Sequence, residues 1–282
     1  ALNSFHVLLF YSIGTAAMLI FVIGVARHII KYNRGQAVNN KFILIDGIRR
    51  MISDVFSHRT IRNRDKKAGW AHAGIFYGYL FAFLGTAIIT VDYDIVQPLF
   101  NVSFWKGKFY LWYSLILDLA HLGLIVSLLY MLIRRATFGL PKLSYIRSYA
   151  GEAGHNSKTS HWAREDWFFI LLLLFIEISG FLQEGTRLLM EQPAWAAWSP
   201  IGNLVATVLS WFGMTPDTAA DFRFGNWWFH AVIALAFTAL IPWYKAKHMI
   251  STLGALSVRE LKPLSRLPGE ASDAEHAGIN SI

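Results

Sequence analysis

Long runs of apolar residues, separated by polar and basic segments, dominate the pattern of the chain. Each run is about twenty residues long, and a helix of that length crosses the roughly 30 Å hydrocarbon core of a bilayer. Trp and Tyr stand at several ends of the runs, as is typical of a membrane–water interface. The alternating segments of a transmembrane β-barrel do not occur. The pattern predicts an all-α, polytopic membrane protein with five transmembrane helices, at residues 7–26, 70–91, 110–133, 167–190 and 227–243.

Two further segments predict helices that do not cross the membrane. Residues 195–214 are apolar enough for a sixth span, but Pro200, Gly202 and Asn203 favour an interfacial or re-entrant helix. In residues 41–56, apolar side chains share one helical face and basic side chains share another. That pattern is typical of a helix lying on a membrane surface.

Charge predicts the orientation. Only 16% of the residues are charged, against about 25% in soluble domains, and the mean hydropathy is +0.39. Three segments, residues 27–67, 134–164 and 245–282, hold 22 of the 26 Lys and Arg residues. With five spans all three lie on one side, which the positive-inside rule makes cytoplasmic, so the N-terminus is expected outside and the C-terminus inside. The net charge of +8 follows mostly from this bias. It is also compatible with contact with anionic lipid or an acidic partner. Nucleic-acid binding is not expected.

The chain contains no cysteine, so it offers no disulfide and no thiolate ligand for an iron–sulfur cluster or a zinc ion. No basic segment or cleavage site precedes the first apolar run, and we expect no removable signal peptide. We expect one membrane domain over residues 1–257, followed by a partly disordered cytoplasmic tail at 258–282.

Four of the ten histidines stand in or at the ends of the predicted spans after the first. His72 opens the second span and His248 follows the fifth, both at the cytoplasmic face. His121 lies about 20 Å from that face, counted along its helix from Arg134. His230 precedes His248 by eighteen residues, which on one continuous helix is five turns and about 27 Å. The histidines therefore form an inner pair, His72 and His248, and an outer pair, His121 and His230.

Two imidazoles from different helices are what a b-type haem iron requires. Two pairs at two depths therefore predict two b-type haems, which cannot be attached covalently because no Cys-x-x-Cys-His motif occurs. Other interpretations stay open. His72 and His248 can each rest at an interface for structural reasons, whereas an intramembrane histidine such as His121 is a functional candidate by default. A haem-free quinone anchor and a proton-relay or transport protein are the alternatives.

Four charged residues lie within the spans. Asp118 precedes His121 by three residues and either orients its ring or faces water or a neighbouring group. Glu184 and Arg187 can pair with each other, bind haem propionates or protonate a quinone. Glu177 lies deeper and must be protonated, paired or functional.

The order of these features resembles the cytochrome b domain of the nitrate reductase gamma-subunit type. That family carries haem-ligating histidines eighteen residues apart in the fifth span, as at His230 and His248, and another matching His72 in GWAHAGIFYGYLFAFLGT. The chain is more similar to the membrane domain of heterodisulfide-reductase-type iron–sulfur oxidoreductases, including those that oxidise electron-transfer flavoprotein. DWFFILLLLFIEISGFLQEGTRL and WWFHAVIALAFTALIPWYKAKH carry this resemblance, which extends over about residues 41–257.

The resemblance implies the electron-transfer subunit of a bacterial or archaeal cytoplasmic-membrane oxidoreductase. It would exchange electrons between a cytoplasmic iron–sulfur or flavoprotein partner and a quinone, either menaquinone or ubiquinone. Two departures matter. Ala82 stands where the nitrate reductase pattern has its other histidine, and we expect His121 to replace it. The cysteine-rich domain is missing, so the iron–sulfur clusters would belong to another subunit.

Overall fold

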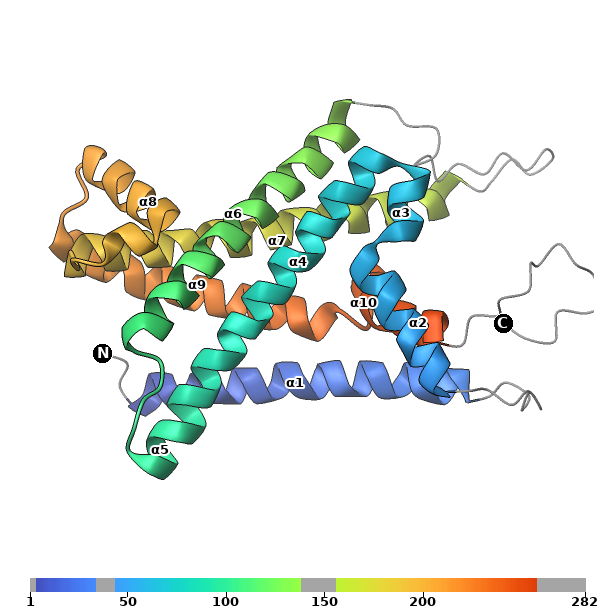
Figure 1. The fold of residues 1–282 in the computed structure, drawn as a ribbon, viewed down its shortest axis with the longest axis horizontal. Coiled ribbons are helices and arrows are strands. Elements are labelled where there is room, and N and C mark those ends of the chain that lie inside the picture. The colour runs from blue at the N-terminus through green and yellow to red at the C-terminus, as the bar shows by residue number, and fades with distance from the viewer. Residues whose placement is uncertain (1–3, 34–43, 138–155, 258–282) are drawn as a thin grey trace, which may run out of the picture.

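The computed structural model describes residues 4–33, 44–137 and 156–257. The tail predicted at residues 258–282 and the start of the helix predicted at 41–56 lie outside these residues. Within them every regular element is helical (Figure 1). In chain order the elements are α1 (Ser4–Tyr32), α2 (Leu44–Ser57), α3 (Arg59–Arg64), α4 (Lys66–Thr90), the π-helix η1 (Val91–Val96), α5 (Gln97–Phe100), α6 (Gly107–Thr137), α7 (Asn156–Glu191), the short 3₁₀-helix η3 (Ala196–Trp198), α8 (Pro200–Trp211), α9 (Pro216–Leu240), the 3₁₀-helix η4 (Lys245–Lys247) and α10 (His248–Ser257).

Four to five of these helices could span a membrane. Four are long and apolar enough by themselves, at Ser4–Tyr32, Lys66–Phe100, Gly107–Thr137 and Arg164–Glu191. They cover the first four predicted runs, so these four helices are confirmed. A fifth span exists only if α9 and the helical segment Lys245–Ser257 count as one, and these two are bent by 66°.

The expectation of one continuous helix from His230 to His248 is wrong. Helix α9 ends at Leu240, and α10 begins only at His248. Pro242 lies in the break. A proline interrupts a helix because it has no N–H to donate and because its ring clashes with the preceding turn. The distance of 27 Å and the shared face that a straight helix would give therefore do not apply to these histidines.

The two predicted non-spanning helices are present. Helix α8 has 12 residues and is about 18 Å long, too short to cross a bilayer. Helix α2 exposes its apolar residues Ile45, Ile48, Ile52 and Phe56, as the pattern predicts. It packs against α10.

The long helices form two pairs, α4 with α6 and α7 with α9, and α1 lies along α9. Glycines allow α4 and α6 to approach closely: a Cβ at Gly78 would lie 2.6 Å from Leu124 of α6, and one at Gly85 would lie 2.5 Å from Leu117. A core of Phe169, Phe237, Ile241 and Ala246 joins α7 to α9 and the break behind it.

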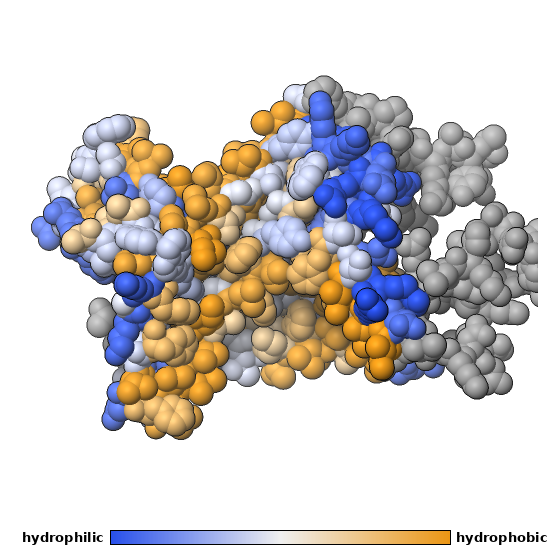
Figure 2. Space-filling view, in the orientation of Figure 1, coloured by the Kyte–Doolittle hydropathy of each residue, from blue (hydrophilic) through white to orange (hydrophobic). Residues whose placement is uncertain are grey.

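The two ends of the bundle differ in character. We call the end at α2, α3 and α10 the α2–α3 end, and the opposite end, at α5 and α8, the α8 end. Figure 2 shows hydrophilic residues gathered over α2 and α3 and apolar residues over the middle of the bundle. This distribution is typical of a membrane protein with a polar surface at each end.

Candidate cofactor site

The structure brings His72 and His248 together at the α2–α3 end. Their ring centroids are 6.4 Å apart, with an angle of 53° between the ring planes. His72 lies in the second turn of α4, and His248 is the first residue of α10. The pair comes from two elements that are 176 residues apart in the sequence, as the haem interpretation requires.

The break after α9 holds His248 in place. The Nδ1–H of His248 donates to the Lys245 carbonyl at 2.9 Å. Lys245 is itself tied to α7, because its side chain pairs with Asp166 and its backbone N–H donates to Glu165 at 3.1 Å. Asp166 is buried and also binds Arg135 of α6. These ion pairs fix the position of His248 relative to α6 and α7.

An N-cap holds the start of α4, where His72 lies. Asp65 accepts from the Ala68 N–H at 3.1 Å and from Arg134 of α6 at 2.5 Å. These two donors hold the pKa of Asp65 below its ordinary value of 3.8. The carboxylate therefore contributes to stability above that value, and the contribution is lost as the pH falls through the folded-state pKa.

A third histidine, which the sequence analysis did not single out, joins the inner pair. His58 is only 6% exposed, and its ring centroid lies 5.3 Å from that of His72 and 4.8 Å from that of Phe76. Burial lowers the pKa of His58 below its ordinary value of 6.5. No sequence signal identifies it, because it lies between two predicted helices in a basic segment.

His121 of α6 binds a carboxylate of α7. Its Nδ1 lies 2.5 Å from Glu177 Oε2. Glu177 is buried, with 4% of its side chain exposed, so the paired interpretation of this residue is confirmed. A carboxylate that accepts from Nδ1 leaves Nε2 of the ring available as a ligand atom.

His230 of α9 is held by the turn of α7 that contains Ile176 and Ser179. Its Nδ1 atom lies 3.1 Å from the Ile176 carbonyl oxygen and 2.9 Å from Ser179 Oγ. Asn226, one turn before His230, donates to the Ser179 carbonyl at 2.9 Å and fixes α9 against α7 at this level. A carbonyl can only accept, so the proton is on Nδ1 and the Nε2 lone pair is available.

Helix α7 therefore orients both outer histidines. His121 binds Glu177 and His230 binds the adjacent Ile176, from α6 and α9 respectively. Among the described side chains, however, the rings of His121 and His230 make no ring contact such as that of His72 and His248. Ser179 and Asn226 were not singled out from the sequence, because single polar residues in an apolar run carry no signal of their partners.

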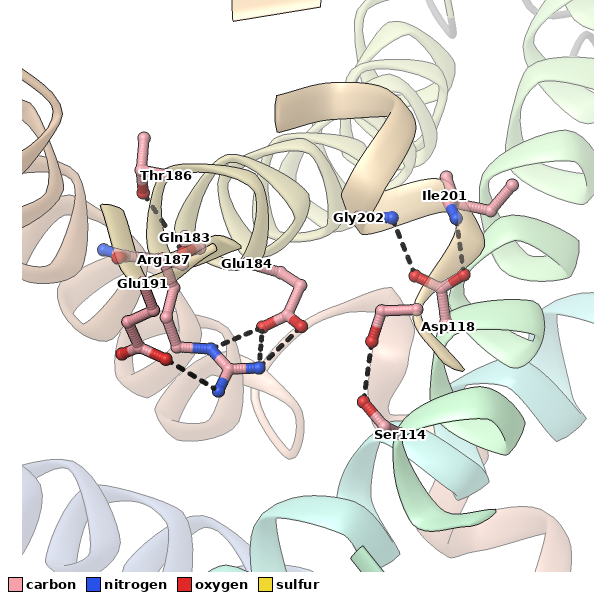
Figure 3. Close-up of polar contacts among 10 residues, drawn as sticks. Ser114, Asp118, Gln183, Glu184, Thr186, Arg187, Glu191, Ile201 and Gly202 are labelled. Carbon is pink, nitrogen blue, oxygen red and sulfur yellow. Dashed lines mark hydrogen bonds and ion pairs between the residues drawn. The ribbon is translucent and has the colours of Figure 1, made fainter. Parts of the chain in front are cut away.

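Asp118 supports α8 and does not bind the ring of His121. Its carboxylate accepts from the backbone N–H groups of Ile201 at 2.7 Å and of Gly202 at 2.9 Å (Figure 3). The first N–H groups of a helix have no partner within the helix, and a side-chain acceptor stabilises them. The structure thus shows Asp118 in contact with a neighbouring helix, and not as the residue that orients the ring of His121.

Glu184 and Arg187 pair with each other at the end of α7 (Figure 3). The guanidinium donates to both carboxylate oxygens, with Nε–Oε2 at 3.0 Å and Nη2–Oε1 at 2.7 Å. Arg187 also lies 4.9 Å from the centroid of the Trp195 ring. The pair faces α8, since a Cβ at Gly202 would lie 2.6 Å from Glu184 Cγ.

An apolar hollow of about 220 Å³ lies between α6, α7 and α8. Its lining is entirely apolar and includes Leu122, next to His121, and Phe181. The Phe181 ring centroid is 6.1 Å from that of His121. The hollow therefore reaches the level of the outer histidines.

Buried polar atoms without a hydrogen-bond partner occur at both levels of the bundle. Among the described residues they are Arg50 Nε, His58 Nδ1 and His72 Nδ1 at the α2–α3 end, and Trp105 Nε1, Gln183 Oε1 and Arg223 Nε toward the α8 end. Most buried polar groups in proteins have a partner, so these atoms can accept a polar ligand group or a water molecule. No three or more His, Cys, Asp or Glu side chains of the described chain form a group that could hold a metal ion. A haem iron needs only two protein ligands, and the ring separation of 6.4 Å between His72 and His248 fits that requirement at the α2–α3 end.

Comparison with known proteins finds a relative that covers most of this chain. No known family profile and no solved structure match the chain. The chain is similar to an EtfAB:quinone oxidoreductase of Syntrophomonas wolfei, with 30% identity over 230 residues. The match covers 78% of this chain but only 29% of the relative, so the chain spans less than a third of that protein's length.

Proposed function

We propose that the chain is a dihaem cytochrome b subunit that carries electrons between a soluble partner and membrane quinone. One b-type haem would be held by His72 and His248, and the other by His121 and His230. The orientation of the chain's own ligand groups supports this proposal.

The separation of 6.4 Å between the rings of His72 and His248 carries the argument. A metal–imidazole bond is about 2 Å long and the ring centre lies about 1 Å further, so two ligands on opposite sides of one ion have centroids roughly 6 Å apart. Packed aromatic rings also lie about 4.5–7 Å apart, so the separation is compatible with a shared iron, and the ligand variants below decide between packing and iron ligation.

The remaining contacts prepare the ligand atoms. Nδ1 of His121, His230 and His248 faces an oxygen of Glu177, Ile176 and Lys245 respectively. Such contacts fix the ring orientation, hold the proton on Nδ1 and make Nε2 more basic, which is the usual second contact of a metal-bound histidine. Haem iron bound there would accept and release single electrons.

The relative's name supports quinone and a flavoprotein as the two redox partners, since it pairs EtfAB with quinone. We place the soluble partner, an iron–sulfur or flavoprotein subunit, at the basic α2–α3 end on the cytoplasmic side. Quinone would bind toward the α8 end, where the apolar hollow suits an isoprenoid tail and Asp118, Glu184 and Arg187 supply polar groups.

Single ligand variants of the purified protein test this assignment. In His72→Ala or His230→Ala, we expect the pyridine haemochrome count to fall from two haems per chain to one. His6→Ala is the matched control, because His6 packs on Phe224 and Trp228 away from both pairs, and its count should stay at two.

Two results contradict the proposal. An unchanged count in both ligand variants would show that other residues hold the haems. A colourless wild-type protein would instead favour a haem-free quinone anchor or a proton relay through the His121–Glu177 pair.

A further inference from the structure

His58 combines two features that a fold does not keep without a reason. Its backbone is in the left-handed region, with φ at 49°, although it is not a glycine. Its Nδ1 is buried and has no hydrogen-bond partner among the described residues. Strained backbone and unpaired buried polar atoms are both unfavourable, and both are concentrated at functional sites.

The position of His58 connects these features to the inner histidine pair. The link between α2 and α3 places its ring against His72, with 5.3 Å between centroids, and His72 in turn faces His248. His72 thus contacts both other rings, whereas His58 makes no ring contact with His248 among the described residues. His58 is therefore beside the pair and is not an alternative to either member.

The unpaired atom limits the chemistry of what His58 can bind. A ring N–H in a buried position needs an acceptor, and a carboxylate gives the stronger, charge-assisted hydrogen bond. On the preceding helix, Arg50 also has a buried Nε without a described partner. Both donors belong to the polar end of the bundle, where an acidic group is less unfavourable than deeper among the apolar residues.

We propose that His58 is a positioning residue of the inner site, whose Nδ1–H donates to a carboxylate of the group that His72 and His248 hold. The inference rests on the proposed function, because a b-type haem supplies such carboxylates as its two propionates. His58 orients the group and stabilises its carboxylate through this hydrogen bond, and it is not an iron ligand.

His58→Phe tests the proposal, because it removes the donor and keeps an aromatic ring against Phe76. We expect two haems per chain, as in the wild type, but a more negative midpoint potential for one of them, because an unscreened carboxylate favours the oxidised iron. A tenfold change in the ratio of reduced to oxidised haem corresponds to a shift of about 59 mV. The potential of the other haem should not change.

Two further variants make the result interpretable. His58→Gly relieves the left-handed strain and also removes the donor, so it should shift the same potential even if His58→Phe folds poorly. His6→Phe makes the same chemical change away from the site and should shift neither potential.

Unchanged potentials in both folded His58 variants would overturn the inference and leave the proposed function intact. Loss of one haem in both variants, as expected for His72→Ala, would also overturn it by making His58 a ligand. A wild-type protein without haem would overturn the proposed function together with the inference.

Discussion

At the scale of single residues, the site depends on what lies behind each imidazole. Helix α7 supplies Glu177 as the partner of His121 and the Ile176 carbonyl as the partner of His230. Without these two contacts, nothing on α7 would fix the orientation of either ring. The sequence indicates the histidines but not these partners. His121 and Glu177 are 56 residues apart, and their contact depends on the rotation of two helices that are apolar on most sides. The hydrophobic pattern of such helices does not define which face meets which neighbour.

Glu177→Gln tests the role of the carboxylate. The uncharged amide accepts a weaker hydrogen bond from His121, so we expect the outer haem to bind about tenfold less tightly. Transfer of haem to excess apomyoglobin measures this change as faster loss of one of the two haems. Glu191→Gln, at an exposed carboxylate of the same helix, should leave the rate unchanged. Equal rates for Glu177→Gln and the wild type would show that the contact does not support the ligand.

At the scale of elements, short sequence features decide how the helices meet. Pro242 is a helix breaker that the sequence shows, yet the predicted span at 227–243 runs through it. A proline within an apolar run can either end a helix or only kink it, and the sequence does not decide between the two. The structure resolves the choice: the His28 ring N–H binds the Pro242 carbonyl at 2.7 Å, and Pro242 fills the space beside Gly24. These contacts come from α1, more than 200 residues away in the sequence, and no local pattern reports them.

The seam between α4 and α6 gives a prediction at this scale. A methyl group at Gly78 would lie 2.6 Å from Leu124 Cβ and 3.1 Å from the Ala120 carbonyl, so Gly78→Ala must push the two helices apart. We expect a loss of about 1–3 kcal/mol, as for other overpacked positions, seen as a lower thermal midpoint in detergent. Gly123→Ala is the matched control, since no atom lies within 4 Å of its added methyl. If the thermal midpoint of Gly78→Ala equals that of Gly123→Ala, then α4 and α6 pack less closely than in the structure.

At the scale of the whole molecule, the pattern predicts the all-helical class and the long apolar helices well, because both follow from run length alone. The count stays at four to five, since it depends on how the bent segment after α9 is treated. The lateral arrangement of α4 and α6 against α7 and α9 could not be predicted. It depends on side-chain contacts between distant segments, such as the pairing of Arg135 with Asp166.

The orientation in the membrane is a prediction that the absence of cysteine makes easy to test. A single cysteine can be introduced at Asn63 in α3 or at Lys106 before α6, both exposed. In spheroplasts of expressing bacteria, a membrane-impermeant maleimide should label Lys106→Cys directly and Asn63→Cys only after lysis. The cysteine-free parent is the control. The reverse pattern would contradict the positive-inside argument and place the basic α2–α3 end outside.

The most direct test of the central claim is the haem content of the purified wild-type chain, measured by pyridine haemochrome against protein concentration. The two histidine levels predict two non-covalently bound b-type haems per chain, both six-coordinate and low-spin in the oxidised and reduced spectra. A preparation that is folded, monodisperse and without a Soret band would contradict the account.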